Sequence, residues 1–296
     1  MIRACAVLGF VSAALALAPP AGARSPAYEL QPSKADPGVR AFDDPSYALI
    51  GAGGGGDVPL VVFLPGTGGK PRGGAALLSV IAGQGYRVIG LGYDDTPAVA
   101  QVCPADPDPD CSESFRRMRV DGAGHAVVSN PPAEAITARL AAQLAMLART
   151  APNEHWERYL ADGQPRWDRI VVSGLSQGAG MAAYIAKHHA VCRVVLFSSP
   201  WDVTGPDHHP APWLSQPSQT PPDRWWAEYH AKENTAGLIR AAYAALQIPP
   251  DHIRVFTQDI PSDFRGNSPN PYHVNTIRDL RYAPDWRIMF GRATGQ

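Results

Sequence analysis

The sequence carries almost no net charge, because its 26 Lys and Arg residues are nearly balanced by 27 Asp and Glu residues. Such a balance gives no electrostatic reason to expect binding to nucleic acid or to an anionic membrane surface. Beyond its first residues, the chain also lacks the roughly 20 consecutive apolar residues that a membrane-spanning helix needs. We therefore expect neither nucleic acid nor a transmembrane segment to figure in its function.

Motifs for cofactors and metals are missing as well. The glycine-rich stretch Gly51–Gly56 is not followed by the lysine of a phosphate-binding loop, so it predicts a hairpin turn. Asp207, His208 and His209 are adjacent, but no further ligand cluster stands at useful spacing. The sequence therefore predicts no cofactor and no metal.

The N-terminus looks like a secretory signal. Arg3 supplies a basic start, residues 4–18 form an apolar stretch too short to span a bilayer, and Ala21-Gly22-Ala23 is a small-x-small cleavage site. This pattern predicts export, with cleavage after Ala23. The mature protein would then be secreted or periplasmic.

Cysteine is scarce, and export changes the interpretation of the few that exist. Cys5 would leave with the signal, whereas Cys103 and Cys111 bracket a polar, proline-rich loop. In an oxidising compartment this spacing predicts a disulfide between them. A metal site is the alternative, but it lacks further ligands. Cys192 starts an apolar run and is expected to be a buried free thiol.

Length and composition suit one large domain. The chain has 296 residues, of which 45% are hydrophobic, and shows no internal repeat and no clear linker. We expect a single α/β domain over residues 24–296. The proline-rich segment near residues 200–222 is the natural place for a cap over a cleft.

Strands and helices are expected to alternate along the chain. Apolar runs predict strands over residues 60–64, 86–93, 170–172, 193–197 and 253–257. A further strand, of mixed composition, is expected over residues 225–231. Helices are expected over residues 74–82, after the Asn130-Pro131 start signal, after the glycine at 178, and over residues 236–247. This alternation predicts a mostly parallel central sheet with helices on both faces.

One motif suggests chemistry. Gly174-Leu175-Ser176-Gln177-Gly178 is a G-x-S-x-G that follows an apolar β-branched run and opens onto small residues suited to a packed helix. A strand that turns sharply into a helix at a serine is a nucleophile elbow, and the glycines leave room for the strained turn. The sequence therefore predicts Ser176 as a nucleophile. A plain glycine-rich turn is the alternative.

With this motif and the glycine loop Phe63–Gly69, the chain resembles the α/β-hydrolase superfamily, and in particular its exported serine esterases and lipases. The resemblance covers residues 58–290. It implies an α/β-hydrolase fold and an oxyanion hole made by the backbone N–H groups of Thr67 and Gln177. The family's usual His-Gly is replaced here by Pro65-Gly66.

The resemblance also implies the order serine, acid, histidine. His273 follows the last predicted strand, in a loop where the family has its base, although a solvated loop histidine is the alternative. Glu233 fits as the acid, because one helix and one strand separate it from His273. Asp202 would require the less common place one strand earlier, and Asp259 leaves no room for the intervening elements.

Four tryptophans are candidates for lining an acyl or aromatic pocket, and core packing explains them equally well: Trp201, Trp213, Trp225 and Trp226. The function implied is an exported serine hydrolase that cleaves a small or polymeric carboxylic ester through an acyl-enzyme. A peptidase or acyltransferase using the same triad is an alternative. A binding protein that kept the scaffold without catalysis is another.

Overall fold

The computed structural model of the protein describes residues 26–51, 56–124, 126–261 and 268–293. The predicted signal over residues 1–23 lies outside these ranges, as do residues 52–55 of the expected glycine-rich hairpin turn.

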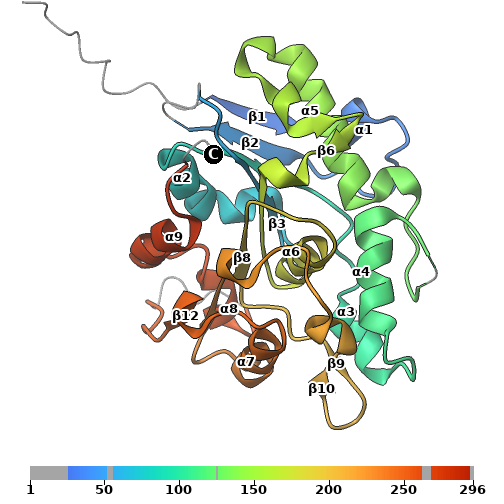
Figure 1. Ribbon diagram of the computed structural model, residues 1–296, viewed down its shortest axis with the longest axis vertical. Coiled ribbons are helices and arrows are strands. Elements are labelled where there is room, and N and C mark those ends of the chain that lie inside the picture. Colours follow the sequence, from blue (N-terminus) through green and yellow to red (C-terminus); the bar gives the residue numbers. More distant parts are fainter. Residues whose placement is uncertain (1–25, 52–55, 125, 262–267, 294–296) are drawn as a thin grey trace, which may run out of the picture.

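An eight-stranded sheet forms the centre of the molecule, in the order β1-β2-β4-β3-β7-β8-β11-β12 (Figure 1). Its strands are β1 (Ala27–Leu30), β2 (Ser46–Ile50), β3 (Leu60–Leu64), β4 (Arg87–Gly90), β7 (Ile170–Leu175), β8 (Arg193–Phe197), β11 (Trp225–His230) and β12 (Ile253–Phe256). Strand β2 is antiparallel to both β1 and β4, and all other neighbours are parallel. The prediction of a mostly parallel sheet is confirmed.

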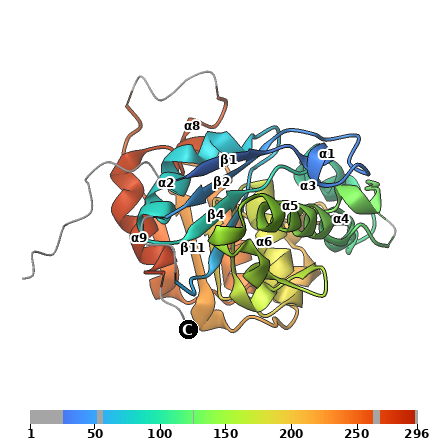
Figure 2. The ribbon, with the colours of Figure 1, turned by 90° about the horizontal axis from the view of Figure 1, so that it is seen from above.

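Helices cover both faces of this sheet (Figures 1 and 2). On one face pack α2 (Ala75–Gly83) and α9 (Ala283–Phe290). On the other pack α4 (Cys111–Asp121), α5 (Ile136–Thr150), α6 (Gln177–His188) and α7 (Ala236–Ala245). The short elements are α1 (Pro32–Ala35), α3 (Val99–Val102), α8 (Pro271–Asn275) and the small hairpins β5 (Leu160–Ala161) with β6 (Gln164–Pro165) and β9 (Val203–Thr204) with β10 (His209–Pro210).

The unbroken apolar runs of the sequence correspond to strands that are buried on both sides. Every residue of β3 is buried, and its side chains alternate between the two cores. Val61 and Phe63 pack towards α2 and α9, whereas Val62 and Leu64 pack towards α6. The period of two in side-chain direction and the cover of helices on both faces explain why no polar residue interrupts the run.

Three local predictions were wrong. Helix α5 begins at Ile136, after a 3-10 turn over Pro132–Glu134, and not at the Asn130-Pro131 signal. The Asn130 side chain instead accepts a hydrogen bond from Arg119 Nη1 at 2.6 Å, so it is not available as a cap. The expected strand over residues 86–93 is shortened to β4. Cys192 is a free thiol, but it is only half-buried.

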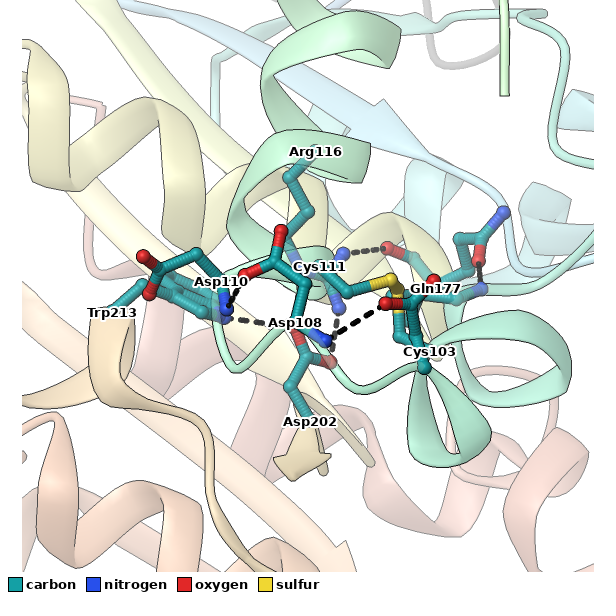
Figure 3. Close-up of a disulfide and its surroundings, with 10 residues drawn as sticks. Cys103, Asp108, Asp110, Cys111, Arg116, Gln177, Asp202 and Trp213 are labelled. Carbon is teal, nitrogen blue, oxygen red and sulfur yellow. Dashed lines mark hydrogen bonds and ion pairs between the residues drawn. A yellow bond between two sulfur atoms is a disulfide. The ribbon is translucent and has the colours of Figure 1, made fainter. Parts of the chain in front are cut away.

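The structure contains the predicted disulfide between Cys103 and Cys111 (Figure 3). It joins the turn after α3 to the first residue of α4, and both cysteines are buried. The proline-rich segment over residues 200–222 carries the β9–β10 hairpin and two 3-10 turns, at Pro212–Ser215 and Pro222–Arg224. These two segments lie next to each other, since β9 contacts the turn that carries Cys103.

Replacing both Cys103 and Cys111 by serine is expected to lower the free energy of unfolding by roughly 2–3 kcal/mol, because the closed loop is short. Urea unfolding measures this loss, and mass spectrometry of a non-reducing digest should find the two peptides linked. Cys192→Ser is the control and should change neither result. Free alkylation of both Cys103 and Cys111 in the native protein would contradict the disulfide.

Candidate active site

The candidate site lies where the strand order of the sheet reverses. From β3 the chain continues to β4 on one side, while β7, β8, β11 and β12 follow one another on the other side. Because these strands are parallel, the segments after β3, β7, β8 and β11 meet at one edge of the sheet. Such a switch point at the carboxyl ends of strands is where open α/β sheets bind ligands.

Ser176 occupies a strained turn at this edge, between the end of β7 and the start of α6. Its backbone has φ 56° and ψ −126°, and its N–H donates to the carbonyl of Phe197 at 2.9 Å. A positive φ is uncommon for a residue with a side chain, and such strain costs about 1–3 kcal/mol. Residues held in this way gather at functional sites, so the strain makes Ser176 a candidate functional residue.

The glycines around Ser176 are required by close approaches of backbone. A Cβ at Gly178 would overlap the carbonyl oxygen of Leu64 at the end of β3, and one at Gly174 would overlap the backbone of Gly178. A Cβ at Gly66 would lie 2.9 Å from Ser176 Cβ and 3.5 Å from Ser176 Oγ. The turn after β7 and the loop after β3 therefore touch each other at the serine.

Two backbone N–H groups beside this contact have no acceptor among the residues that the structure describes. Thr67 lies in a turn that is closed by a hydrogen bond from the N–H of Gly69 to the carbonyl of Gly66, at 2.8 Å. The N–H of Thr67 itself donates to none of the described residues. Gln177 is the first residue of α6, where helix geometry provides no acceptor and the helix dipole is positive. Both groups are donors suited to a negatively charged oxygen.

The loop after β4 fixes both of these donors. The Asp95 carboxylate accepts the N–H of Gly68 at 3.0 Å, and the Asp95 carbonyl accepts Gln177 Nε2 at 2.7 Å. Gln177 Oε1 in turn accepts the N–H of Val99 at 2.7 Å. Burial raises the pKa of Asp95, and the Gly68 hydrogen bond opposes that rise. Sequence reasoning missed Asp95, although its place after a strand at this edge was a usable signal.

The structure brings Glu233 and His273 together. His273 Nδ1 lies 2.6 Å from Glu233 Oε2. The other carboxylate oxygen, Oε1, accepts the hydroxyl of Ser198 at 2.6 Å and the N–H of His230 at 2.7 Å. The Glu233 side chain is fully buried, so these three partners replace the water that an exposed carboxylate would bind.

His273 is not in a loop as expected, but in the third position of the short helix α8. Its side chain keeps 12% of its surface exposed, so the imidazole is reachable from solvent. The Trp201 ring packs edge-on against it, with ring centroids 5.3 Å apart. One nitrogen of the imidazole is therefore held by Glu233, and one flank of the ring is held by Trp201.

Asp202, the alternative acid, is engaged elsewhere (Figure 3). Its carboxylate forms a two-pronged ion pair with the Arg116 guanidinium, in which Arg116 Nε lies 2.6 Å from Oδ2, and Trp213 Nε1 donates to the same Oδ2 at 3.0 Å. Arg116 also donates to the Gln177 carbonyl at 3.4 Å. A Cβ at Gly180 would overlap the guanidinium, so this glycine makes room for it.

Asp202→Ala is expected to lower the free energy of unfolding by about 3–5 kcal/mol, because it leaves the buried Arg116 charge without a partner. The matched control is Glu29→Ala, which breaks an exposed pair with Arg72 and should cost about 0–1 kcal/mol. Denaturant unfolding of both variants measures the difference. Equal losses in the two variants would mean that the Arg116–Asp202 pair is not buried as described.

No model of a protein family matches the chain, and neither does any curated protein sequence. Among solved structures, the chain is similar to a putative dienelactone hydrolase from Klebsiella pneumoniae subsp. pneumoniae MGH 78578, with 16% identity, 90% of this chain and 99% of that chain covered, and a TM-score of 0.45. An α/β serine hydrolase without lid from Xanthomonas campestris matches with 12% identity, 94% and 100% coverage, and a TM-score of 0.45.

The chain's own strand order, with a serine turn between a central parallel strand and the following helix, decides the fold. The protein has the α/β-hydrolase fold. On this scaffold, Ser176 follows β7, Glu233 follows β11 and His273 follows β12.

One buried acid near this site was not anticipated. Glu228 on β11 is fully buried and lies 3.4 Å from the Ser198 hydroxyl that also holds Glu233. Burial raises the pKa of Glu228 well above its ordinary value, and the nearby Glu233 carboxylate raises it further, while hydrogen bonds from Thr276 and Ser198 oppose the rise. Nothing in the sequence indicated that this glutamate of a predicted strand is buried beside Glu233.

Glu228→Gln is expected to gain stability relative to the unchanged protein as the pH rises from 4 to 8. Because the pKa of Glu228 is raised in the folded state, the folded protein keeps a proton on this carboxyl above pH 4.5, whereas the unfolded chain releases it. The free energy of unfolding therefore falls as the pH rises. The neutral amide removes that dependence. Thermal unfolding at several pH values measures the difference, and a gap that does not change with pH would contradict a protonated Glu228.

Proposed function

We propose that the protein is a serine hydrolase that cleaves carboxylic esters through an acyl-enzyme. The observation that carries the proposal is Ser176, held at positive φ beside two N–H groups that lack acceptors in the described chain. The hydrogen bond between Glu233 and His273 supports it, because a serine hydroxyl needs a base that is itself oriented by a carboxylate.

In the first half of the reaction, Ser176 Oγ attacks the ester carbonyl while His273 Nε2 takes the hydroxyl proton. The negative charge that develops on the carbonyl oxygen is met by the N–H groups of Thr67 and Gln177. Collapse of this intermediate breaks the bond to the alcohol oxygen, and His273 returns the proton to that oxygen. The alcohol leaves, and the acyl group stays on Ser176.

In the second half, water replaces the alcohol. His273 takes a proton from the water while the water oxygen attacks the acyl-enzyme carbonyl. His273 then gives the proton to Ser176 Oγ as the carboxylic acid leaves. Glu233 keeps the Nδ1 proton of His273 in place and stabilises the imidazolium in both halves. Its two hydrogen bonds from Ser198 and His230 keep the carboxylate aimed at the ring.

We further propose that the protein acts after export, in the secreted or periplasmic space, as one domain over residues 24–296. The Cys103–Cys111 disulfide supports this, because disulfides persist in oxidising compartments. Within the ranges that the structure describes, none of the helices combines the length and the apolar character needed to cross a bilayer.

Ser176→Ala and Ser176→Gly are both expected to abolish hydrolysis of p-nitrophenyl acetate and labelling by a fluorophosphonate probe. The glycine variant should also unfold at a higher temperature than the alanine variant, because glycine adopts φ 56° without strain. Active-site labelling and thermal unfolding are the measurements. An unchanged protein that folds but is neither labelled nor active would favour a binding protein on this scaffold.

Glu233→Gln is expected to lower kcat by several orders of magnitude, up to about 10⁴, because the amide cannot stabilise the imidazolium. The control is Asp259→Asn, which changes an exposed acid after the last strand, β12, and should retain activity. Ester hydrolysis with both purified variants measures the effect. A Glu233→Gln variant of ordinary activity would remove Glu233 from the triad and leave Ser176 untouched.

A further inference from the structure

A cavity of about 250 Å³ lies beside the candidate site. Its walls come from α3, the disulfide turn, the start of α4, the β9–β10 hairpin and α7. Two of its lining residues contact the site, since the Trp201 ring packs on the His273 ring and the Val99 N–H donates to Gln177 Oε1. The cavity is therefore one contact away from the imidazole of His273 and from the side chain of Gln177.

The wall of this cavity is mainly apolar. Val99, Pro104, Leu238 and the buried Cys103 of the disulfide line it, together with Trp201. Among its lining residues, Asp202 and His208 alone have side chains that can carry a charge.

The charged lining residue is Asp202, and its carboxylate is already bound by Arg116 and by Trp213 (Figure 3). Both members of this ion pair have only 1% of their side-chain surface exposed, so the charge is compensated within the wall. His208 also lines the cavity but is exposed in the hairpin, at the rim. An apolar, uncharged group therefore fits the interior better than an ionic one.

One polar side chain in the wall lacks a partner. Ser112, in the first turn of α4, is 2% exposed, and its hydroxyl has no hydrogen bond to any described residue. A buried hydroxyl without a partner is unfavourable, and native structures contain few of them. A polar atom on a group seated in the cavity would satisfy it.

The volume sets the size of that group. A dry cavity of about 150 Å³ in another, engineered protein is known to take up benzene. The present cavity of about 250 Å³ is therefore large enough for one aromatic ring with a small substituent.

We propose that this cavity is the specificity pocket of the enzyme, and that it takes an uncharged aromatic ring whose hydroxyl or ether substituent binds Ser112. This rests on the proposed function for the bond that is cleaved, but binding of the ring itself does not require catalysis. The substrate class is then an ester in which one half is a phenol-like ring.

Binding is tested first, with p-cresol and toluene as probes and ligand-observed NMR as the measurement. The unchanged protein should bind p-cresol more tightly than toluene by about three- to tenfold, the size of one buried neutral hydrogen bond. Ser112→Ala should remove this preference. The control Ser114→Ala changes a serine of the same helix that does not line the cavity, and should keep it.

A second variant locates the binding independently of Ser112. Ala100 lines the cavity but is exposed, so Ala100→Trp should fold and fill the space. Binding of both probes should then be lost. Equal affinity for the two probes in the unchanged protein, or binding that survives Ala100→Trp, would overturn the proposal.

Turnover is tested with two matched pairs of esters: methyl 4-hydroxybenzoate against methyl benzoate, and 4-hydroxybenzyl acetate against benzyl acetate. In one of the two pairs, kcat/KM of the unchanged protein should be higher for the hydroxylated ester than for the unsubstituted one. The ratio of the two kcat/KM values should be about three- to tenfold lower in Ser112→Ala. That pair identifies the half of the ester that the pocket holds. A ratio independent of Ser112 in both pairs would overturn the pocket's role in specificity.

Fluorophosphonate labelling of Ser176 separates this proposal from the proposed function. If the protein is labelled but shows no Ser112-dependent binding, the proposed hydrolase function is supported and the proposed pocket is overturned. If the protein binds p-cresol through Ser112 but is not labelled, the pocket is supported and the hydrolase function is overturned.

Discussion

The site depends on how closely the turn after β7 approaches the end of β3. Gly178 rests against the carbonyl of Leu64, and Gly66 rests against Ser176, at distances that leave no room for a side chain. This contact brings the loop that carries Thr67 against the turn that carries Gln177, in which Ser176 has a positive φ. The remaining parts of the site, including the Asp95 loop and the Glu233–His273 pair, are arranged around it.

Chain order predicted a large part of this arrangement. Apolar runs such as residues 60–64 identified the central strands because burial on both faces excludes polar residues. The expected helix and strand between acid and base favoured Glu233 over Asp202. In the structure, α7 and β12 separate Glu233 from His273, and the two side chains lie 2.6 Å apart. Topology constrains which loops can meet, and topology is visible in the sequence.

Side-chain partners far apart in the chain were not predictable in this way. Nothing near Asp202 indicates Arg116, which is 86 residues away, and nothing in β11 indicates that Glu228 is buried beside Glu233. Asn130 has the local pattern of a helix cap, but its pairing with Arg119 overrode that preference. Arg119 is buried and already paired with Asp94, and Asn130 supplies a further acceptor for its guanidinium. A local cap preference is lost here because a buried donor without an acceptor is costly.

The space that Gly180 leaves for the Arg116 guanidinium also limits how relatives of this protein can diverge. A side chain at position 180 would displace the Arg116 guanidinium from its present place, and with it the partner of the buried Asp202 carboxylate. The three positions are therefore expected to change together over evolution. An alignment of homologues would show them as one covarying group that links α4, α6 and the segment after β8.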